Sequence, residues 1–159
     1  MVKLSPGVER AQVQTYLDDG ARLTFVSVEG DLKEALPAGA MFRSALAVLL
    51  TKEATHVWSD HPAVESRISE PRGWLVEPDP AIIRAGLVAN LALEIGGAQL
   101  DPEIAYITTD AKPETPWARA WRILDWMPFN LKKLRAYLRE RGVGQVTVKK
   151  RGRRSRPKP

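Results

Sequence analysis

The stretch VEPDPAIIRAGLVANLALEIGG, residues 76–97, decides the fold of the surrounding chain. Asp79 is a good N-cap, because its carboxylate can accept backbone N–H groups that the first helical turn leaves free. Pro80 suits the first helical position, where a missing N–H costs nothing. The apolar residues that recur every four positions form one stripe, made of Ile83, Leu87 and Leu91. The stretch therefore predicts one helix that begins at Asp79 and is ended by Gly96 and Gly97.

Two strands are expected before this helix. Residues 21–30 alternate in a strand pattern and are rich in β-branched side chains, and residues 41–50 are a second apolar run of strand length. We expect these two to pair antiparallel, with residues 31–40 as a short turn of helix or a bent strand. So small a pair is not stable alone in water. Its apolar surface must be covered by the second half of the chain, by self-association or by another molecule.

The chain after the first helix predicts a small sheet and a second helix. Strands are expected within residues 104–110 and 117–129, and Pro113 and Pro116 mark the loop between them. The second helix begins near Asn130 and is stopped by Gly142. The buried stripe of this helix is expected to consist of Leu131, Leu134 and Leu138. A last strand is expected in QVTVKK, with Val146 and Val148 facing the core. Strands interleaved with two helices indicate an α/β or α+β fold.

The charges are distributed unevenly along the chain. Residues 131–159 hold twelve Lys/Arg and one acid, whereas residues 1–130 hold the other twelve basic residues and eighteen acids. An acidic body with a basic end points to a polyanionic partner. The alternative is a tail that only improves solubility, and the charges alone leave both open.

Sequence motifs for catalysis and metal binding are scarce. The chain has no Gly-x-Gly-x-x-Gly or Walker loop, no Gly-x-Ser-x-Gly elbow and no cysteine. The spacing of His56 and His61 matches no standard zinc pattern, so no metal site is predicted. Glu77 and Asp79 resemble paired catalytic acids, but helix capping explains Asp79 and is the interpretation we favour.

The five tryptophans allow two interpretations, since an exposed one can stack on single-stranded nucleic acid while core packing is the commoner reason. No run of eighteen apolar residues is present, so no membrane span is predicted. The first ten residues lack the apolar stretch of a secretory signal, which together with the lack of cysteine favours a cytoplasmic location.

Several blocks of sequence together resemble one family. They are VKLSPGVE, VSVEGDLKEAL, WLVEPDPAIIRAGLVANLA, LDPEIAYITTD, PFNLKKLRAYLRERGVG and VTVKKRG, in this order. They are similar to the C-terminal half of a family of bacterial class I S-adenosylmethionine-dependent methyltransferases whose members carry a THUMP-like domain. The resemblance covers residues 2 to about 152.

The resemblance implies a division of the chain. Residues 1–52 would be the C-terminal strands of the methyltransferase fold, a remnant antiparallel pair, and residues 53–71 a linker or strap. Residues 72–150 would form a THUMP-like mixed sheet with two main helices, and residues 151–159 a disordered basic tail. The strands and Gly-rich loop that hold the cofactor in the family are missing, and the family domain continues beyond VKKRG. The chain is therefore expected to be a fragment, a split gene product or a truncated relative. S-adenosylmethionine is implied by the family, but no cofactor is expected on this chain alone.

Three functions follow from these features as hypotheses. The first is an RNA-binding accessory region of a methyltransferase, with phosphate contacts from Lys149, Lys150, Arg151, Arg153, Arg154, Arg135 and Arg139. The second is a protein-docking module that completes a separately encoded methyltransferase half, which is compatible with the first. The third, a free-standing enzyme, is disfavoured, because no cofactor loop, thiol or placed acid–base pair is present.

Overall fold

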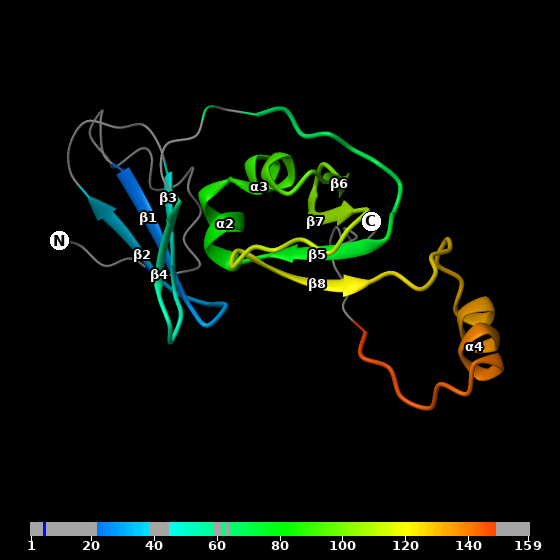
Figure 1. Cartoon of the computed structure of the whole chain (residues 1–159). Helices are drawn as coiled ribbons and strands as arrows, with labels where there is room; N and C mark the ends of the chain where they lie inside the picture. The colour runs from blue at the N-terminus through cyan, green and yellow to red at the C-terminus, as the bar shows by residue number, and fades with distance from the viewer. Residues whose placement is uncertain (1–4, 6–21, 39–44, 59–61, 63, 149–159) are drawn as a thin grey trace, which may run out of the picture.

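The computed structural model describes residues 5, 22–38, 45–58, 62 and 64–148, and these form two four-stranded sheets with three helices (Figure 1). The fold is a mixed α/β arrangement, as predicted. The first sheet contains β1 (Arg22–Val28), β2 (Asp31–Ala38), β3 (Ala45–Leu50) and β4 (Thr55–Trp58). The second contains β5 (Trp74–Pro78), β6 (Ala98–Asp101), β7 (Ile104–Thr109) and β8 (Ala118–Arg122).

The first sheet has the order β2-β1-β3-β4. Glu29 and Gly30 both have positive φ, 51° and 83°, as a two-residue hairpin turn between β1 and β2 requires. β1 and β3 pair in parallel, from Leu23 opposite Ala45 to Val28 opposite Leu50. The predicted antiparallel pairing of these two strands is therefore wrong. β2 reverses the chain once, so the next strand runs again in the direction of β1.

Two segments of the first sheet differ from the sequence-based expectations. Residues 31–38 form the whole strand β2, so the bent-strand alternative is correct and the helical one is not. β4 lies inside the range expected to be a linker and pairs antiparallel with β3. Later in that range, the strap runs beside the second sheet, where Ile68 forms a bridge with Gln99.

The expected long helix is two short ones, α2 (Pro80–Ala85) and α3 (Val88–Glu94). Asp79 caps α2 and Pro80 opens it, as predicted. Gly86, with φ 73°, ends α2, and the N–H groups of Gly86 and Leu87 return to the carbonyls of Ile83 and Ile82. The apolar stripe at four-residue spacing continues across Gly86, and for this reason the sequence pattern did not reveal the break between α2 and α3. Gly96, with φ 67°, then ends α3 in the same way.

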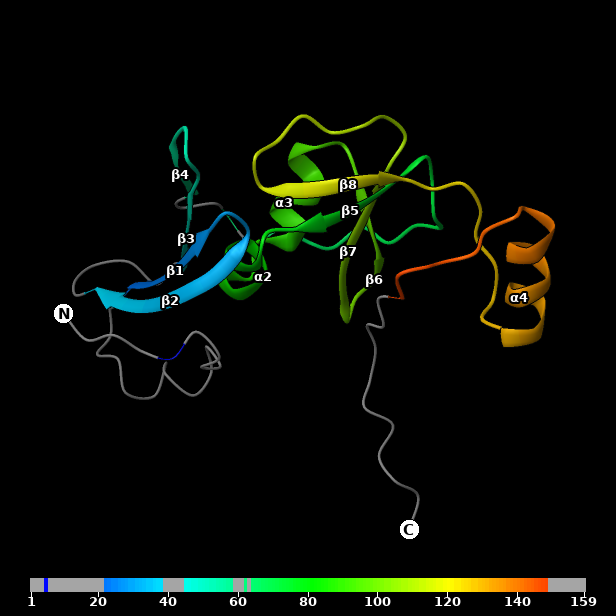
Figure 2. The ribbon, with the colours of Figure 1, turned by 90° about the horizontal axis from the view of Figure 1, so that it is seen from below.

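The second sheet has the order β6-β7-β5-β8, and all its neighbouring strands are antiparallel. α3 packs against β6 and β7, while α2 packs against β1 and β3 of the first sheet. Figure 2 shows β5, β7 and β8 on the side of α3 that faces the viewer. α2 thus joins the two sheets into one core, whose fully buried side chains include Phe25, Val76, Ile82, Leu91 and Ile107.

The C-terminal helix α4 (Leu131–Glu140) stands apart from both sheets in Figures 1 and 2. Its predicted bounds are confirmed, since Asn130 caps it and Gly142 ends it with φ 66°. Its predicted buried stripe is wrong, because none of its residues is buried and Leu131 is 51% exposed. Amphipathic spacing predicts a helix with an apolar side, but it does not predict whether another part of the chain packs against that side.

Residues 145–148 form no strand, although a strand was predicted over QVTVKK. Val146 and Val148 are 50% and 79% exposed, so they do not face the core. Alternation favours a strand only where a neighbouring strand supplies hydrogen bonds. No described strand lies beside this segment.

Candidate functional site

The predicted phosphate-contacting residues fall into two groups. Arg135 and Arg139 are exposed and lie one turn apart on α4. The others lie outside the residues that the structure describes: Lys149, Lys150, Arg151, Arg153 and Arg154. The proposed tail, residues 151–159, lies there too, so both predictions stay predictions.

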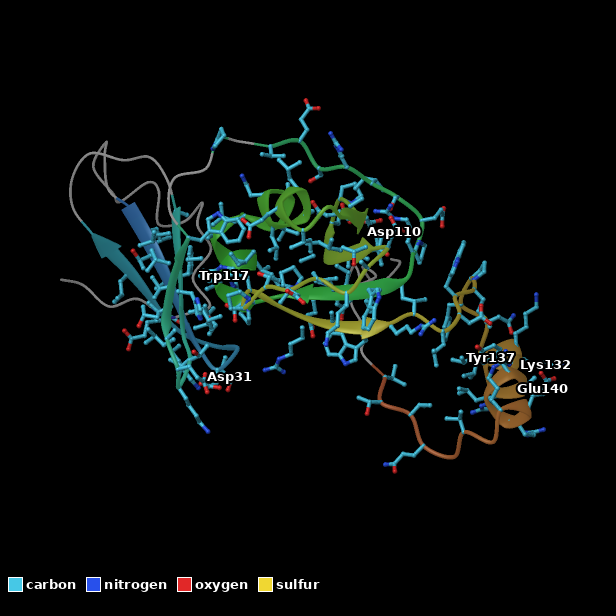
Figure 3. All side chains as sticks on the ribbon, in the orientation of Figure 1. Asp31, Asp110, Trp117, Lys132, Tyr137 and Glu140 are labelled. Carbon is cyan, nitrogen blue, oxygen red and sulfur yellow. The ribbon has the colours of Figure 1, made fainter. Side chains whose placement is uncertain are left out.

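One side of α4 is a basic groove. It is lined by Leu131, Lys132, Arg135, Ala136 and Arg139. The lining combines two apolar side chains with three cations, and long basic side chains can lay their aliphatic stems along such an apolar surface while the charges stay in water. Figure 3 shows Lys132 and Glu140 on the side of α4 turned away from the sheets.

The opposite side of α4 holds the preceding segment in place. Lys133, Tyr137 and Arg141 follow each other at four-residue spacing and so form one stripe. The Arg141 guanidinium carbon lies 3.6 Å from the centre of the Tyr137 ring. Tyr137 also hydrogen-bonds to Asp125, and its partial burial together with this bond raises the pKa of its hydroxyl. This contact places the Asp125 carboxylate beside Tyr137 of α4.

The sequence alone did not show which aromatic side chains are exposed, and the structure places three of them in β8 and in the segment that joins it to α4. Trp121, Trp126 and Phe129 are 42%, 54% and 85% exposed, whereas Trp58 and Trp117 are buried against each other, 5.7 Å between ring centres. The strand register could have identified Trp121, which alternates with the core-facing Ala120 and lies on the opposite face of β8. The five tryptophans therefore divide between core packing and surface.

A second candidate site is the cleft where the two sheets meet. Its volume is about 450 Å³, and its polar lining residues include Glu29, Thr51, Glu77, Asp79 and Arg119. Asp79 Oδ1 accepts hydrogen bonds from Ser27 Oγ at 2.5 Å and from the Ala81 N–H at 2.8 Å. Arg119 donates to the carbonyl of Glu29 at 3.2 Å. Both Asp79 and Arg119 join the sheets, which supports the structural interpretation of Asp79.

Burial of the Asp79 carboxyl is the main influence on its pKa and raises it above the ordinary value of 3.8. The hydrogen bonds from Ser27 and Ala81, and the charge of Arg119, lower it and partly offset the burial. These are the interactions of a helix cap that also bridges two sheets.

A metal site finds no support in the described part of the chain. No group of three or more His, Cys, Asp and Glu that could hold an ion occurs among these residues. His56 lies in β4 and contacts the ring of Trp117 edge-on, 6.2 Å between ring centres. His61 lies outside the described residues.

The described residues do not fit S-adenosylmethionine as a doubly wound fold would hold it. Such folds bind nucleotide cofactors at the carboxyl ends of parallel strands, in a Gly-rich loop that leads into a helix. β1 and β3 are the parallel pair, but β1 ends in the hairpin turn at Glu29 and Gly30. β3 ends in a short turn closed by the Thr51 N–H and the Ala54 carbonyl, 2.9 Å apart. No step of chemistry is therefore assigned to this cofactor.

Comparison with known proteins agrees with the resemblance seen in the sequence. A family model described as THUMP domain-like matches residues 118–158, which include β8 and α4. The chain is also 31% identical over 157 residues to an uncharacterized S-adenosylmethionine-dependent methyltransferase of Mycobacterium tuberculosis, found in strains CDC 1551 and H37Rv. The match spans 96% of this chain. The resemblance to S-adenosylmethionine-dependent methyltransferases with a THUMP-like domain is confirmed.

The chain spans 42% of the length of these curated relatives, so it corresponds to a part of them. A solved structure, of a protein from Porphyromonas gingivalis W83 named as a methyltransferase, superposes with a TM-score of 0.70. It covers 87% of this chain and 38% of the other, at 20% identity, which confirms the fold. No helix in the described residues is long and apolar enough to span a membrane.

Proposed function

We propose that this chain is an RNA-binding accessory region of an S-adenosylmethionine-dependent methyltransferase and is not catalytic by itself. One observation carries the proposal: residues 118–148 hold seven Lys/Arg and two acids, within the stretch that matches the THUMP-like family. All five of the cations on and next to α4 are exposed, namely Lys132, Lys133, Arg135, Arg139 and Arg141.

The electrostatics of this region favour a polyanion. The basic segment of residues 149–158 is separated from the end of α4 by eight residues in the sequence, so we expect both to act on the same ligand. Cations that neutralise phosphates release counterions, and this makes binding favourable and strongly dependent on salt. Phosphate contacts of this kind position RNA without reading its bases.

The non-catalytic part of the proposal rests on the same structure. Neither parallel strand is followed by a cofactor loop, and the buried Asp79 carboxylate is engaged in capping α2. Catalysis would then belong to the remainder of a methyltransferase, where S-adenosylmethionine would bind. We infer a cytoplasmic location as well, because RNA is the proposed partner and the chain contains no cysteine.

The test compares two pairs of arginines. Arg135→Ala with Arg139→Ala removes charge from α4, while Arg67→Ala with Arg84→Ala removes two exposed arginines elsewhere. We expect only the α4 pair to lower RNA affinity and to reduce the slope of log K against log salt, by about 0.7 for each phosphate that is no longer neutralised. Equal effects of the two pairs would contradict a defined RNA surface.

A second function is favoured by the outer face of the first sheet. On β1 and β3, the half-buried side chains that alternate with the buried ones are apolar except for Thr24, namely Val26, Val28, Leu46, Val48 and Leu50. Parallel strands are usually covered on both faces. We infer that this face docks a separately encoded methyltransferase half. Val48→Lys should abolish co-purification with the remainder of a relative's chain produced separately, and retained co-purification would contradict it.

A further inference from the structure

We propose that unpaired RNA bases stack on aromatic side chains of β8 and of the segment that joins it to α4, so that the ligand of this region is single-stranded RNA. The stacking surface consists of Trp121, Trp126 and Phe129. This inference rests on the proposed RNA-binding function and specifies which form of RNA is bound and by which contacts.

The exposure of these side chains is the first observation. Phe129 is 85% exposed and Trp126 is 54% exposed. By contrast, Trp58 and Trp117 of the same chain are only 4% and 6% exposed. Burial of large aromatic side chains contributes strongly to folding, and that contribution is largely absent where a ring stays in water. Exposed rings are therefore available to stack on a base, and every base has a face that can do so.

The second observation is that part of this surface is held in place. Oδ1 of Asp125 accepts a hydrogen bond from the Trp126 N–H at 2.8 Å, and its carboxylate also hydrogen-bonds to Tyr137. The Asp125 carboxylate thus links the backbone at Trp126 to Tyr137 on α4, on the side that carries Lys133 and Arg141. At the other end, Trp121 is held in β8 by its pairing with Leu75 of β5.

Charge distinguishes RNA from an apolar protein partner. Arg122 directly follows Trp121 in the sequence, and Lys133 and Arg141 border the segment at α4. The one acid within residues 118–139 is Asp125, which is engaged with Tyr137. A ligand on this surface therefore meets aromatic faces beside cations, which is the combination that binds single strands. A duplex keeps its bases paired and stacked and offers mainly phosphates, sugars and shape.

The experiment titrates the full chain with a single-stranded oligonucleotide of about eight nucleotides and with its duplex, following tryptophan fluorescence at several salt concentrations. Trp126→Ala and Phe129→Ala are each expected to weaken single-strand binding by about 5- to 100-fold without changing the salt slope. Lys133→Ala should instead reduce the slope by about 0.7. Trp126→Phe should retain most of the affinity, because a ring remains. Leu93→Ala, which removes a 53% exposed side chain from α3, is the control and should bind like the parent.

The outcomes separate this inference from the function on which it rests. If the parent binds single strands but Trp126→Ala and Phe129→Ala bind equally well, or if duplex binds as tightly, stacking is wrong and RNA binding stands. If the parent binds no RNA at low salt, both are wrong. If the substitutions change only the oligomeric state measured by sedimentation, the aromatic surface serves self-association and the inference is overturned.

Discussion

The hydroxyl of Ser27 in β1 donates a hydrogen bond to Oδ1 of Asp79, the residue that caps α2, at 2.5 Å. Ser27 is fully buried and Asp79 is 6% exposed. The same oxygen accepts the Ala81 N–H, so one carboxylate both starts the helix and attaches it to the first sheet. Two parts of the chain 52 positions apart are thereby joined at one atom.

Removing this carboxylate should destabilise the chain. Asp79→Ala removes a helix cap and leaves the buried Ser27 hydroxyl without its acceptor, so we expect the free energy of unfolding to fall by about 2–4 kcal/mol. Ser27→Ala should cost less, about 1–2 kcal/mol, because the Ala81 N–H keeps its acceptor. Asp31→Ala, at an exposed aspartate, is the control and should stay within about 0.5 kcal/mol. Urea unfolding measures all three, and a parent-like Asp79→Ala would contradict the bridging role.

The pH dependence of stability should carry the signature of Asp79. Its pKa is raised in the folded state, chiefly by burial, so above pH 3.8 the folded chain binds more protons than the unfolded one. The contribution of this group to stability is therefore full below 3.8 and is lost as the pH rises through the folded pKa. We therefore compare the free energy of unfolding of the parent with that of Asp79→Asn. The difference, parent minus variant, should fall as the pH rises from 3.8 through the folded pKa of Asp79. A difference that rises would show that the pKa is lowered instead.

Two leucines should differ sharply, although both lie at helical spacing in the sequence. Leu91 on α3 is fully buried, whereas Leu131 on α4 is 51% exposed. We expect Leu91→Ala to cost about 2–5 kcal/mol and Leu131→Ala less than about 0.5 kcal/mol. Chemical denaturation of both variants tests this. A large destabilisation by Leu131→Ala would mean that α4 packs against the rest of the chain.

Local signals in the sequence predicted much of the fold. The cap at Asp79, the cap at Asn130 and the stops at Gly96 and Gly142 are set by hydrogen bonds within a few residues, and all four are confirmed. The parallel pairing of β1 with β3 was not predictable in this way, because it depends on the strand that intervenes. The break at Gly86 was missed because the apolar stripe continues across it, with Ile82 buried before the glycine and Leu87 and Leu91 buried after it.

The candidate site was only partly predictable. Lysines and arginines of α4 are visible in the sequence, and an amphipathic helix exposes its polar side. Whether the apolar side is covered depends on tertiary packing, so the exposure of Leu131 and Phe129 required the structure. The hydrogen bond of Asp125 with Tyr137 also could not be foreseen, because several rotamers of each side chain are compatible with the sequence.

The chain alone should bind S-adenosylmethionine weakly or not at all. The reason is that neither β1 nor β3 leads into a Gly-rich loop and a helix N-terminus. Isothermal titration calorimetry of the full chain tests this directly. Stoichiometric binding in the micromolar range would require a cofactor site of a different kind, with the cleft between the sheets as the first place to examine.

The most direct test of the central claim is the salt dependence of RNA binding by the whole chain and by a variant in which Lys149, Lys150 and Arg151 are changed to Ala. With about four to six phosphates neutralised, the slope of log K against log salt should be roughly −3 to −4 for the parent. The variant should bind more weakly and with a shallower slope, by similar amounts for different RNA sequences, because phosphate contacts do not read bases. A variant that binds as tightly as the parent at every salt concentration, or a parent that binds no RNA, would contradict the claim that this region binds RNA through its basic end.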